Sequence, residues 1–198
     1  MYAISLTEVR KNDPVFSSSV VAVEQYLGRL PFNGLLRQLG DTRNLHETLF
    51  RRFQPHEYKD ACGNYRGTEG TTVEKWNIGR DPSAPAAFSS AYQDVAHDIE
   101  SLAETIQRMD MSDAPDRYFR KSVFIFQRFQ TIHPYYDGNG HIDRLIIKSL
   151  MRRHKDIYEY TDFPISPHPF TTGLQICIEN YKHHPELLQS YFLNWFRY

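Results

Sequence analysis

Residues 133–144 decide the fold of this chain, and they read His-Pro-Tyr-Tyr-Asp-Gly-Asn-Gly-His-Ile-Asp-Arg. An apolar, aromatic segment precedes them at 118–132, and apolar residues follow at helical spacing over 142–150. Pro134 disfavours helical backbone at His133, the residue before it. The stretch is therefore predicted to be a loop between two helices, one of which is buried on all sides.

The second half of this loop has the composition of an anion site. Gly138 and Gly140 lie on either side of Asn139 and remove Cβ atoms near the amides that begin the second helix. A helix N-terminus with accessible amides binds anions, most often phosphate. Arg144 follows His141 by one helical turn, so both are expected to project toward the same anion, and arginine can bind two phosphate oxygens at once. The residues predict a phosphate-binding loop.

Two further side chains of the loop suggest a reaction. The carboxylate of Asp137 can hold Mg²⁺ together with phosphate oxygens. The imidazole of His133, at the other end of the loop, can accept a proton from a hydroxyl when it is neutral. Phosphoryl or nucleotidyl transfer to a hydroxyl, driven by positioning and charge stabilisation, is the chemistry that this set predicts.

Two simpler interpretations compete with this one. The Asp-Gly and Asn-Gly pairs within 137–140 would serve equally well as turns between helices, but a turn requires neither His133 nor Arg144. His141 and Asp143 have the spacing of part of a two-histidine, one-carboxylate iron site. Ligands of that site usually lie on strands of a β-barrel, whereas this region is predicted to be helical.

The loop closely resembles the signature of the Fic/Doc (Fido) family, His-x-Phe-x-Asp/Glu-Gly-Asn-Gly-Arg-x-x-Arg. Tyr135 stands where the family has phenylalanine, and His141 replaces the first arginine of the signature. An ordered run of matches between two helices is far more specific than a lone glycine motif. The matching residues are His133, Asp137, Gly138, Asn139, Gly140 and Arg144.

A second region also resembles the family. Residues 61–66, Ala-Cys-Gly-Asn-Tyr-Arg, are similar to the segment that enters the family's β-hairpin flap, with one residue inserted. Residues 71–78 alternate and are rich in β-branched types, which predicts a strand. In the family the flap docks an extended segment of the target by strand addition. The resemblance therefore implies target docking at Thr72, Val73, Glu74 and Lys75, whereas the residues alone favour an ordinary surface hairpin.

The resemblance, which covers residues 45–151, implies an all-α Fic-type helical bundle with one small β-hairpin flap, and the whole chain, 1–198, is expected to be one domain. It implies a protein adenylyltransferase that moves AMP from ATP to a Ser, Thr or Tyr hydroxyl of a target protein. The roles implied are the base for His133, Mg²⁺ binding for Asp137, and phosphate binding for Gly138, Asn139, Gly140, His141 and Arg144.

Other functions stay open at this point. A neutral histidine at position 141 binds phosphate more weakly than arginine does. This substitution would be compatible with a different nucleotide donor, with phosphotransfer or with the removal of AMP. The same substitution would suit a non-catalytic module that binds a nucleotide or a partner. The retained Gly-Asn-Gly sequence argues for ordinary nucleotide geometry, and adenylyl transfer is preferred.

Regulation is less well defined by the sequence. Many Fic proteins carry an inhibitory helix with the pattern Ser/Thr-x-x-x-Glu-Gly/Asn. Glu24 follows serines that lie one residue too far away, and Glu179 is followed by Asn180 but lacks the Ser/Thr. Either glutamate is equally a plain helix-surface charge, and an antitoxin or another inhibitory partner that supplies the helix is a further alternative.

Composition sets broader expectations. The chain has 198 residues with 40% hydrophobic and 24% charged residues, which is typical of one globular domain. Its formal net charge of -1 gives no general attraction to nucleic acid or to an anionic membrane. Two cysteines make no disulfide framework, so a reduced, cytoplasmic compartment is expected, and the N-terminus shows neither a signal peptide nor a membrane span.

Elements outside the loop are also predicted. Serines at 17–19 are expected to cap a helix that ends near Gly28 or Pro31. A helical stripe follows at 45–53, and an amphipathic helix covers 95–109. The sequence Asp113-Ala114-Pro115 begins the helix that leads to the loop. Two helices, about 170–183 and 186–196, are expected to close the domain.

Overall fold

The quoted stretch joins two long helices, α6 (Pro115–Ile132) and α7 (Asn139–Met151), that pack against each other. The computed structural model describes residues 13–53, 56–76, 89–165 and 172–198. α6 begins with proline at its first position, as predicted, because proline lacks the N–H that would be left without a partner there.

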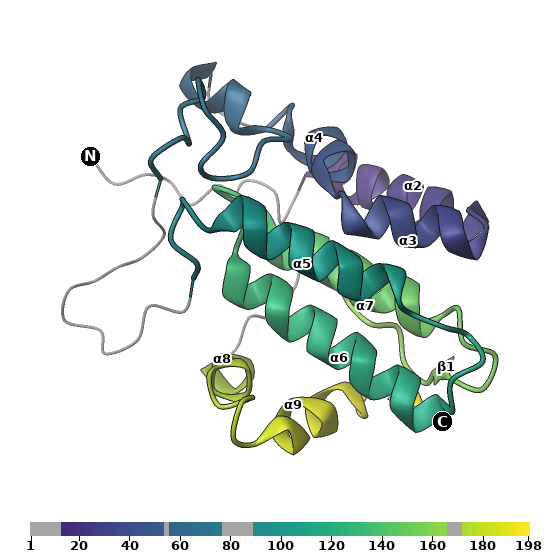
Figure 1. Ribbon diagram of the computed structural model, residues 1–198. Coiled ribbons are helices and arrows are strands. Elements are labelled where there is room, and N and C mark those ends of the chain that lie inside the picture. Colours follow the sequence, from purple (N-terminus) through teal and green to yellow (C-terminus); the bar gives the residue numbers. More distant parts are fainter. Residues whose placement is uncertain (1–12, 54–55, 77–88, 166–171) are drawn as a thin grey trace.

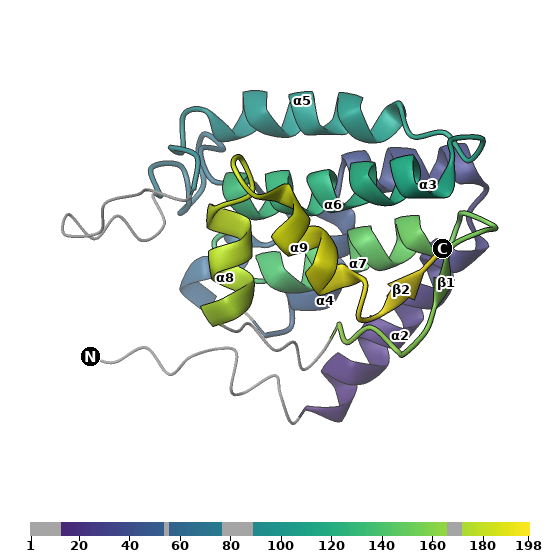
Figure 2. The same cartoon turned by 90° about the horizontal axis from the view of Figure 1, so that it is seen from below.

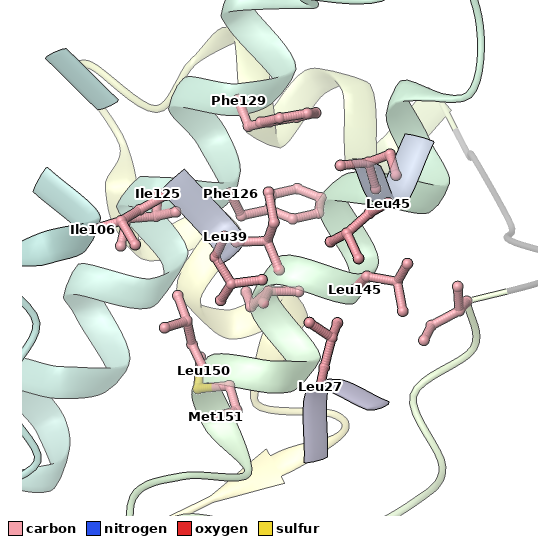
Figure 3. Packing of buried hydrophobic residues seen from close by; sticks show 14 of the residues in the cluster. Leu27, Leu39, Leu45, Ile106, Ile125, Phe126, Phe129, Leu145, Leu150 and Met151 are labelled. Carbon is pink, nitrogen blue, oxygen red and sulfur yellow. The ribbon is translucent and has the colours of Figure 1, made fainter. Parts of the chain in front are cut away.

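α7 is the helix that is buried on all sides. Apart from Gly140 and Ser149, which are half-buried, every residue from Asn139 to Met151 is buried. α2 (Pro14–Arg29) and α6 both pack against α7. Figure 3 shows side chains of these helices converging in the core, among them Leu27, Ile125, Phe126, Phe129, Leu145, Leu150 and Met151.

The other α-helices that precede α6 reach this pair directly or through one another. α3 (Phe32–Gly40) packs on α5 (Val95–Gln107), and α4 (Arg43–Phe50) packs on α2. α5 in turn packs along α6, and Figure 1 shows α5 between α3 and α6. A short 3₁₀ helix, η1 (His56–Ala61), follows α4.

The C-terminal helices cover the other side of α6. α8 (Thr172–Glu179) and α9 (Pro185–Phe192) pack against each other and against α6, which thus lies between α5 and this pair (Figure 2). β1 (Tyr158–Glu159) and β2 (Phe196–Arg197) form a small antiparallel sheet with Tyr158 opposite Arg197. Within the described ranges no helix is long and apolar enough to cross a membrane.

The all-α fold class with one small antiparallel element is confirmed, but that element is not where the sequence predicted a strand. Residues 71–76 are turns. Gly67 and Gly70 have φ angles of 89° and 75°, and the amide of Glu74 donates to the Thr71 carbonyl at 3.1 Å. The side chain of Val73 is fully buried. The segment folds on itself to bury this one valine, so the strand predicted over 71–76 is wrong, and residues 77–78 lie outside the described ranges.

The start of α2 also differs from the prediction. Asp13 is the capping residue, and its Oδ1 accepts hydrogen bonds from the amides of Val15 at 2.7 Å and Phe16 at 3.4 Å. The hydroxyl of Ser18 instead donates back to the Pro14 carbonyl at 2.8 Å. An aspartate one residue before Pro14 is a stronger start signal than the serines, because the carboxylate also favours the positive end of the helix dipole.

Candidate active site

The loop between α6 and α7 is held by one asparagine. Oδ1 of Asn139 accepts the Tyr135 amide at 2.9 Å, and Nδ2 donates to the Tyr135 carbonyl at 2.8 Å. Both ends of this side chain are therefore used to close the loop on itself. Phosphate contact by Asn139 stays a prediction, and it would fall to the backbone N–H at the first position of α7.

Gly138 is required where it stands for two reasons. Its φ of 81° belongs to the left-handed region, and a Cβ there would lie 2.6 Å from two ring atoms of Phe50. Its amide donates to Oδ1 of Asp137 at 2.6 Å. The carboxylate of Asp137 is thereby held half-buried beside the N-terminus of α7.

A histidine that the sequence analysis did not single out anchors the loop from α4. The Gly63 amide donates to Nδ1 of His46 at 3.1 Å, so the ring proton is on Nε2, which donates to the Asp137 carbonyl at 2.9 Å. The imidazole stacks on the Tyr135 ring at 3.8 Å with an interplanar angle of 11°. Its sequence signal was its place beside Leu45 and one turn before Phe50, on the apolar face of its helix.

Tyr135, which replaces the family's phenylalanine, is fully buried with its hydroxyl 2.8 Å from Oγ1 of Thr42. Burial raises the pKa of this phenol well above its ordinary value. Thr42 precedes α4, so the hydroxyl adds a second link between that helix and the loop. The substitution is explained by this partner, because a buried phenol needs one.

His133, the predicted base, has φ 51° and ψ 59°, and it is the only non-glycine residue with a positive φ in the described part of the chain. Burial, and then the positive charge of Arg66, lower the pKa of His133 to about 4. The imidazole is therefore neutral at pH 7, the form in which it can accept a proton.

Arg144 and His141 pack against different neighbours. The guanidinium of Arg144 lies 5.2 Å from the centre of the Phe163 ring, and Nη1 is 3.5 Å from the Pro164 carbonyl oxygen. The ring of His141 meets the ring of Phe16 edge-on at 5.0 Å. His141 also lies 5.7 Å from Phe50. That both side chains reach donor phosphates remains a prediction.

Asp143, considered above only as an iron ligand, is a buried acid on α7. It is fully buried, and neither carboxyl oxygen reaches hydrogen-bonding geometry with any described residue, although Gln130 and Arg144 lie near enough to favour the carboxylate. Burial outweighs both and raises the pKa of Asp143 well above its ordinary value. Burial therefore favours the protonated form of this side chain, compared with that of an exposed aspartate.

The two glutamates considered for regulation lie on different helices. Oε1 of Glu24 on α2 is 3.0 Å from Nζ of Lys148 and 3.2 Å from Nη1 of Arg152, both of which lie beyond Arg144 along the chain. Glu179 is the last residue of α8. An inhibitory role for either glutamate remains a prediction.

The turns at 71–76 lie beside the loop. Tyr136 stacks on Tyr58 at 5.0 Å with an interplanar angle of 12° and meets Trp76 at 4.8 Å. Thr72 is tied by its amide and hydroxyl to the carboxylate of Asp60, at 2.8 and 2.6 Å. Docking of a target at Thr72–Lys75 stays a prediction, but several main-chain groups of this segment are already paired.

A magnesium ion fits this site only as a companion of phosphate. Among the described residues no group of three or more His, Cys, Asp or Glu side chains could hold a metal. A single half-buried carboxylate, Asp137, beside the N-terminus of α7 is compatible with the way Mg²⁺ is usually bound, with few protein ligands and several oxygens from phosphate and water.

Comparison with known proteins agrees with this geometry. The model of the Fic/DOC family matches residues 38–151, more than half of the 198 residues. No curated protein matches the chain. The matched range contains α4, α5, α6, α7 and the loop. The chain belongs to the Fic/DOC family.

Proposed function

We propose that the protein is an adenylyltransferase that transfers AMP from ATP to a Ser, Thr or Tyr hydroxyl of a target protein. The observation that carries the proposal is a neutral histidine, His133, on the same loop as a helix N-terminus that no side chain caps. Membership of the Fic/DOC family supports group transfer of this kind.

His133 is the base of the proposed reaction. Its neutral imidazole takes the proton of the target hydroxyl, and the hydroxyl oxygen attacks the α-phosphorus of ATP. The new oxygen–phosphorus bond forms as the bond to the β-phosphate oxygen breaks, and pyrophosphate leaves. A pKa of about 4 keeps the base deprotonated at neutral pH but makes it a weak one, so positioning must contribute much of the rate.

The start of α7 is the proposed phosphate site. No side chain caps this helix, and its first turn contains no acidic residue, so the helix dipole and the first amides favour an anion. Amides of Asn139 and Gly140 would bind the α-phosphate, and the amide of Gly138 would join them by exchanging its bond to Asp137. Arg144 and His141 would bind the outer phosphates. Bound at Asp137, Mg²⁺ would neutralise negative charge on the phosphates.

The target protein would dock beside the loop, along Thr72, Val73, Glu74 and Lys75. Tyr58 stacks on Tyr136 and Trp76 meets the same ring edge-on, and these contacts support this place because they keep the turn segment next to the loop. The hydroxyl to be modified would then lie near His133. We further propose that an inhibitory glutamate regulates the site. It would come from a partner, such as an antitoxin, or from the chain itself, as Glu24 or Glu179.

Transfer of radiolabel tests the proposal. The protein is incubated with Mg²⁺ and ATP labelled either at the α- or at the γ-phosphate, alone and with a cell lysate. AMP transfer labels protein from α-labelled ATP only. The variant His133→Ala should lose the signal, while His184→Ala, which removes an exposed histidine paired with Glu186, should keep it.

Other results of the same experiment identify the alternatives. Protein labelling from γ-labelled ATP would indicate a phosphotransferase, and labelling from another nucleotide only would indicate a different donor. Nucleotide binding without labelling from any donor would refute the proposed transfer and leave a non-catalytic module.

A further inference from the structure

Arg66 is buried next to the predicted base and donates to four backbone carbonyls. Only 1% of the residue is exposed. Nε donates to the carbonyl of His133 at 2.8 Å, and Nη2 donates to that of Ile132 at 2.9 Å. The same guanidinium reaches the carbonyls of Trp76 and Ser90, each at 3.0 Å.

The backbone of Arg66 adds a third contact to the same turn. Its amide donates to the Pro134 carbonyl at 2.8 Å. Carbonyls of three successive residues, 132–134, therefore all accept from this one arginine. The carbonyls of Ile132 and His133 are among those that the end of α6 leaves without helical partners, at the negative end of the helix dipole.

Within the described ranges no carboxylate forms an ion pair with Arg66. Burial lowers its pKa only to about 10, so the guanidinium stays charged at neutral pH. A charged group is costly to bury, and the described partners of this one are the dipoles of backbone carbonyls. Burying a charge in this way costs free energy that packing alone would not explain.

We propose that Arg66 is the positioning residue of the base: it locks His133 in the left-handed backbone conformation that turns the imidazole to the phosphate-binding loop. A non-glycine residue at φ 51° persists only when its surroundings hold it there. The planar guanidinium supplies that hold from several directions at once, which a lysine ammonium cannot. The same guanidinium also bonds to the carbonyls of Trp76 and Ser90. It therefore connects the turns at 71–76 and the segment before α5 to the backbone of the base.

The test compares Arg66→Lys with a matched control, Arg153→Lys. Nη2 of Arg153 donates to the carbonyls of Leu27, Gly28 and Leu30, at 2.8, 3.0 and 2.7 Å, and so closes the end of α2. This arginine lies past the far end of α7, roughly 20 Å along that helix from the loop. Arg66→Gln is a second variant. Lysine would bury an ammonium charge that lacks the hydrogen bonds of the guanidinium, whereas the amide of glutamine is neutral.

Two measurements follow. The first is the ring ¹H–¹³C cross-peak of His133 without nucleotide, assigned by its loss in His133→Ala. The second is the rate of AMP incorporation from α-labelled ATP, which alone rests on the proposed function. Arg66→Lys and Arg66→Gln should shift or split the cross-peak and lower the maximal rate about ten- to a hundredfold, with KM for ATP within about twofold. Arg153→Lys should change neither quantity, although it too should lower the unfolding temperature.

The outcomes are distinct. An unchanged cross-peak and rate in both Arg66 variants would overturn the positioning role. Equal loss of rate in Arg66→Lys and Arg153→Lys would also overturn it, because general destabilisation would then suffice. A shifted cross-peak in a protein that transfers no AMP even as wild type would support the positioning role and refute the proposed function.

Discussion

Asp143→Asn is expected to change how the stability of this protein depends on pH. Burial raises the pKa of Asp143 well above its ordinary value, and it outweighs the opposite effects of Gln130 and Arg144. An unfolded aspartate has a pKa of about 3.9. Above that pH the unfolded chain has lost the proton that the folded protein keeps, so folding takes up a proton.

The magnitude follows from this linkage. Within the window that opens near pH 4 and closes at the raised pKa, the wild-type free energy of unfolding falls by about 1.4 kcal/mol for each pH unit on account of this group. The amide introduced by Asp143→Asn does not titrate in this range. The free energy of unfolding of the variant should therefore rise relative to that of the wild type by about 1.4 kcal/mol for each pH unit. At pH 4 the two proteins should be similar, because the window has only begun to open and this group has so far cost the wild type little stability.

Urea unfolding at pH 4, 5, 6 and 7 measures the difference directly. Asp156→Asn, which changes an exposed carboxylate just after α7, is the matched control and should follow the wild-type curve. Parallel stability curves for wild type and Asp143→Asn would refute the reasoning, since they would mean that Asp143 is ionised in the folded protein.

Three further outcomes are expected at the loop. Asp137→Ala, like EDTA with the wild type, should suppress AMP transfer and make nucleotide affinity independent of Mg²⁺; full activity without divalent cations would contradict the assignment. His141→Arg should tighten ATP binding by about 1.5 to 3 kcal/mol and flatten its pH dependence between about pH 6 and 8, and identical titrations would place residue 141 away from the donor. Gly138→Ala should destabilise the protein by about 1 to 3 kcal/mol through its positive φ alone, and more through the clash with Phe50, so wild-type stability in thermal unfolding would contradict the close packing of Phe50 on this turn.

Local sequence was sufficient for the helices and for the loop between them. Proline at 115 and at 134, and the glycines of the loop, mark where α6 begins, where it ends and where α7 begins, because these residues act on the backbone within one or two positions. Apolar spacing predicted the helices around them for the same reason. The Asp13 cap was missed although its signal was local, since serines four to six residues later gave a competing one.

Residues 71–76 show where local pattern misleads. Alternating β-branched residues predict a strand, but Gly70 and the carboxylate of Asp60 favour turns, and burial of Val73 decides between them. The pattern carries no information on Asp60, because that residue lies 12 positions before Thr72. The small sheet formed by Tyr158–Glu159 and Phe196–Arg197 was missed for a similar reason: pairs this short and this far apart have no periodic signal.

By itself, then, the sequence determined that His133, Asp137 and the glycines stand within one loop between two helices, and the chemistry that we propose is based on these residues. The tertiary structure alone decided the state in which they are held. His46 reaches Asp137 across 91 positions and Arg66 reaches His133 across 67, and their effect on tautomer, backbone angle and pKa exists only once burial has removed water. The raised pKa of Asp143 was equally beyond the sequence, because burial in the folded interior outweighs the charge of its neighbour Arg144.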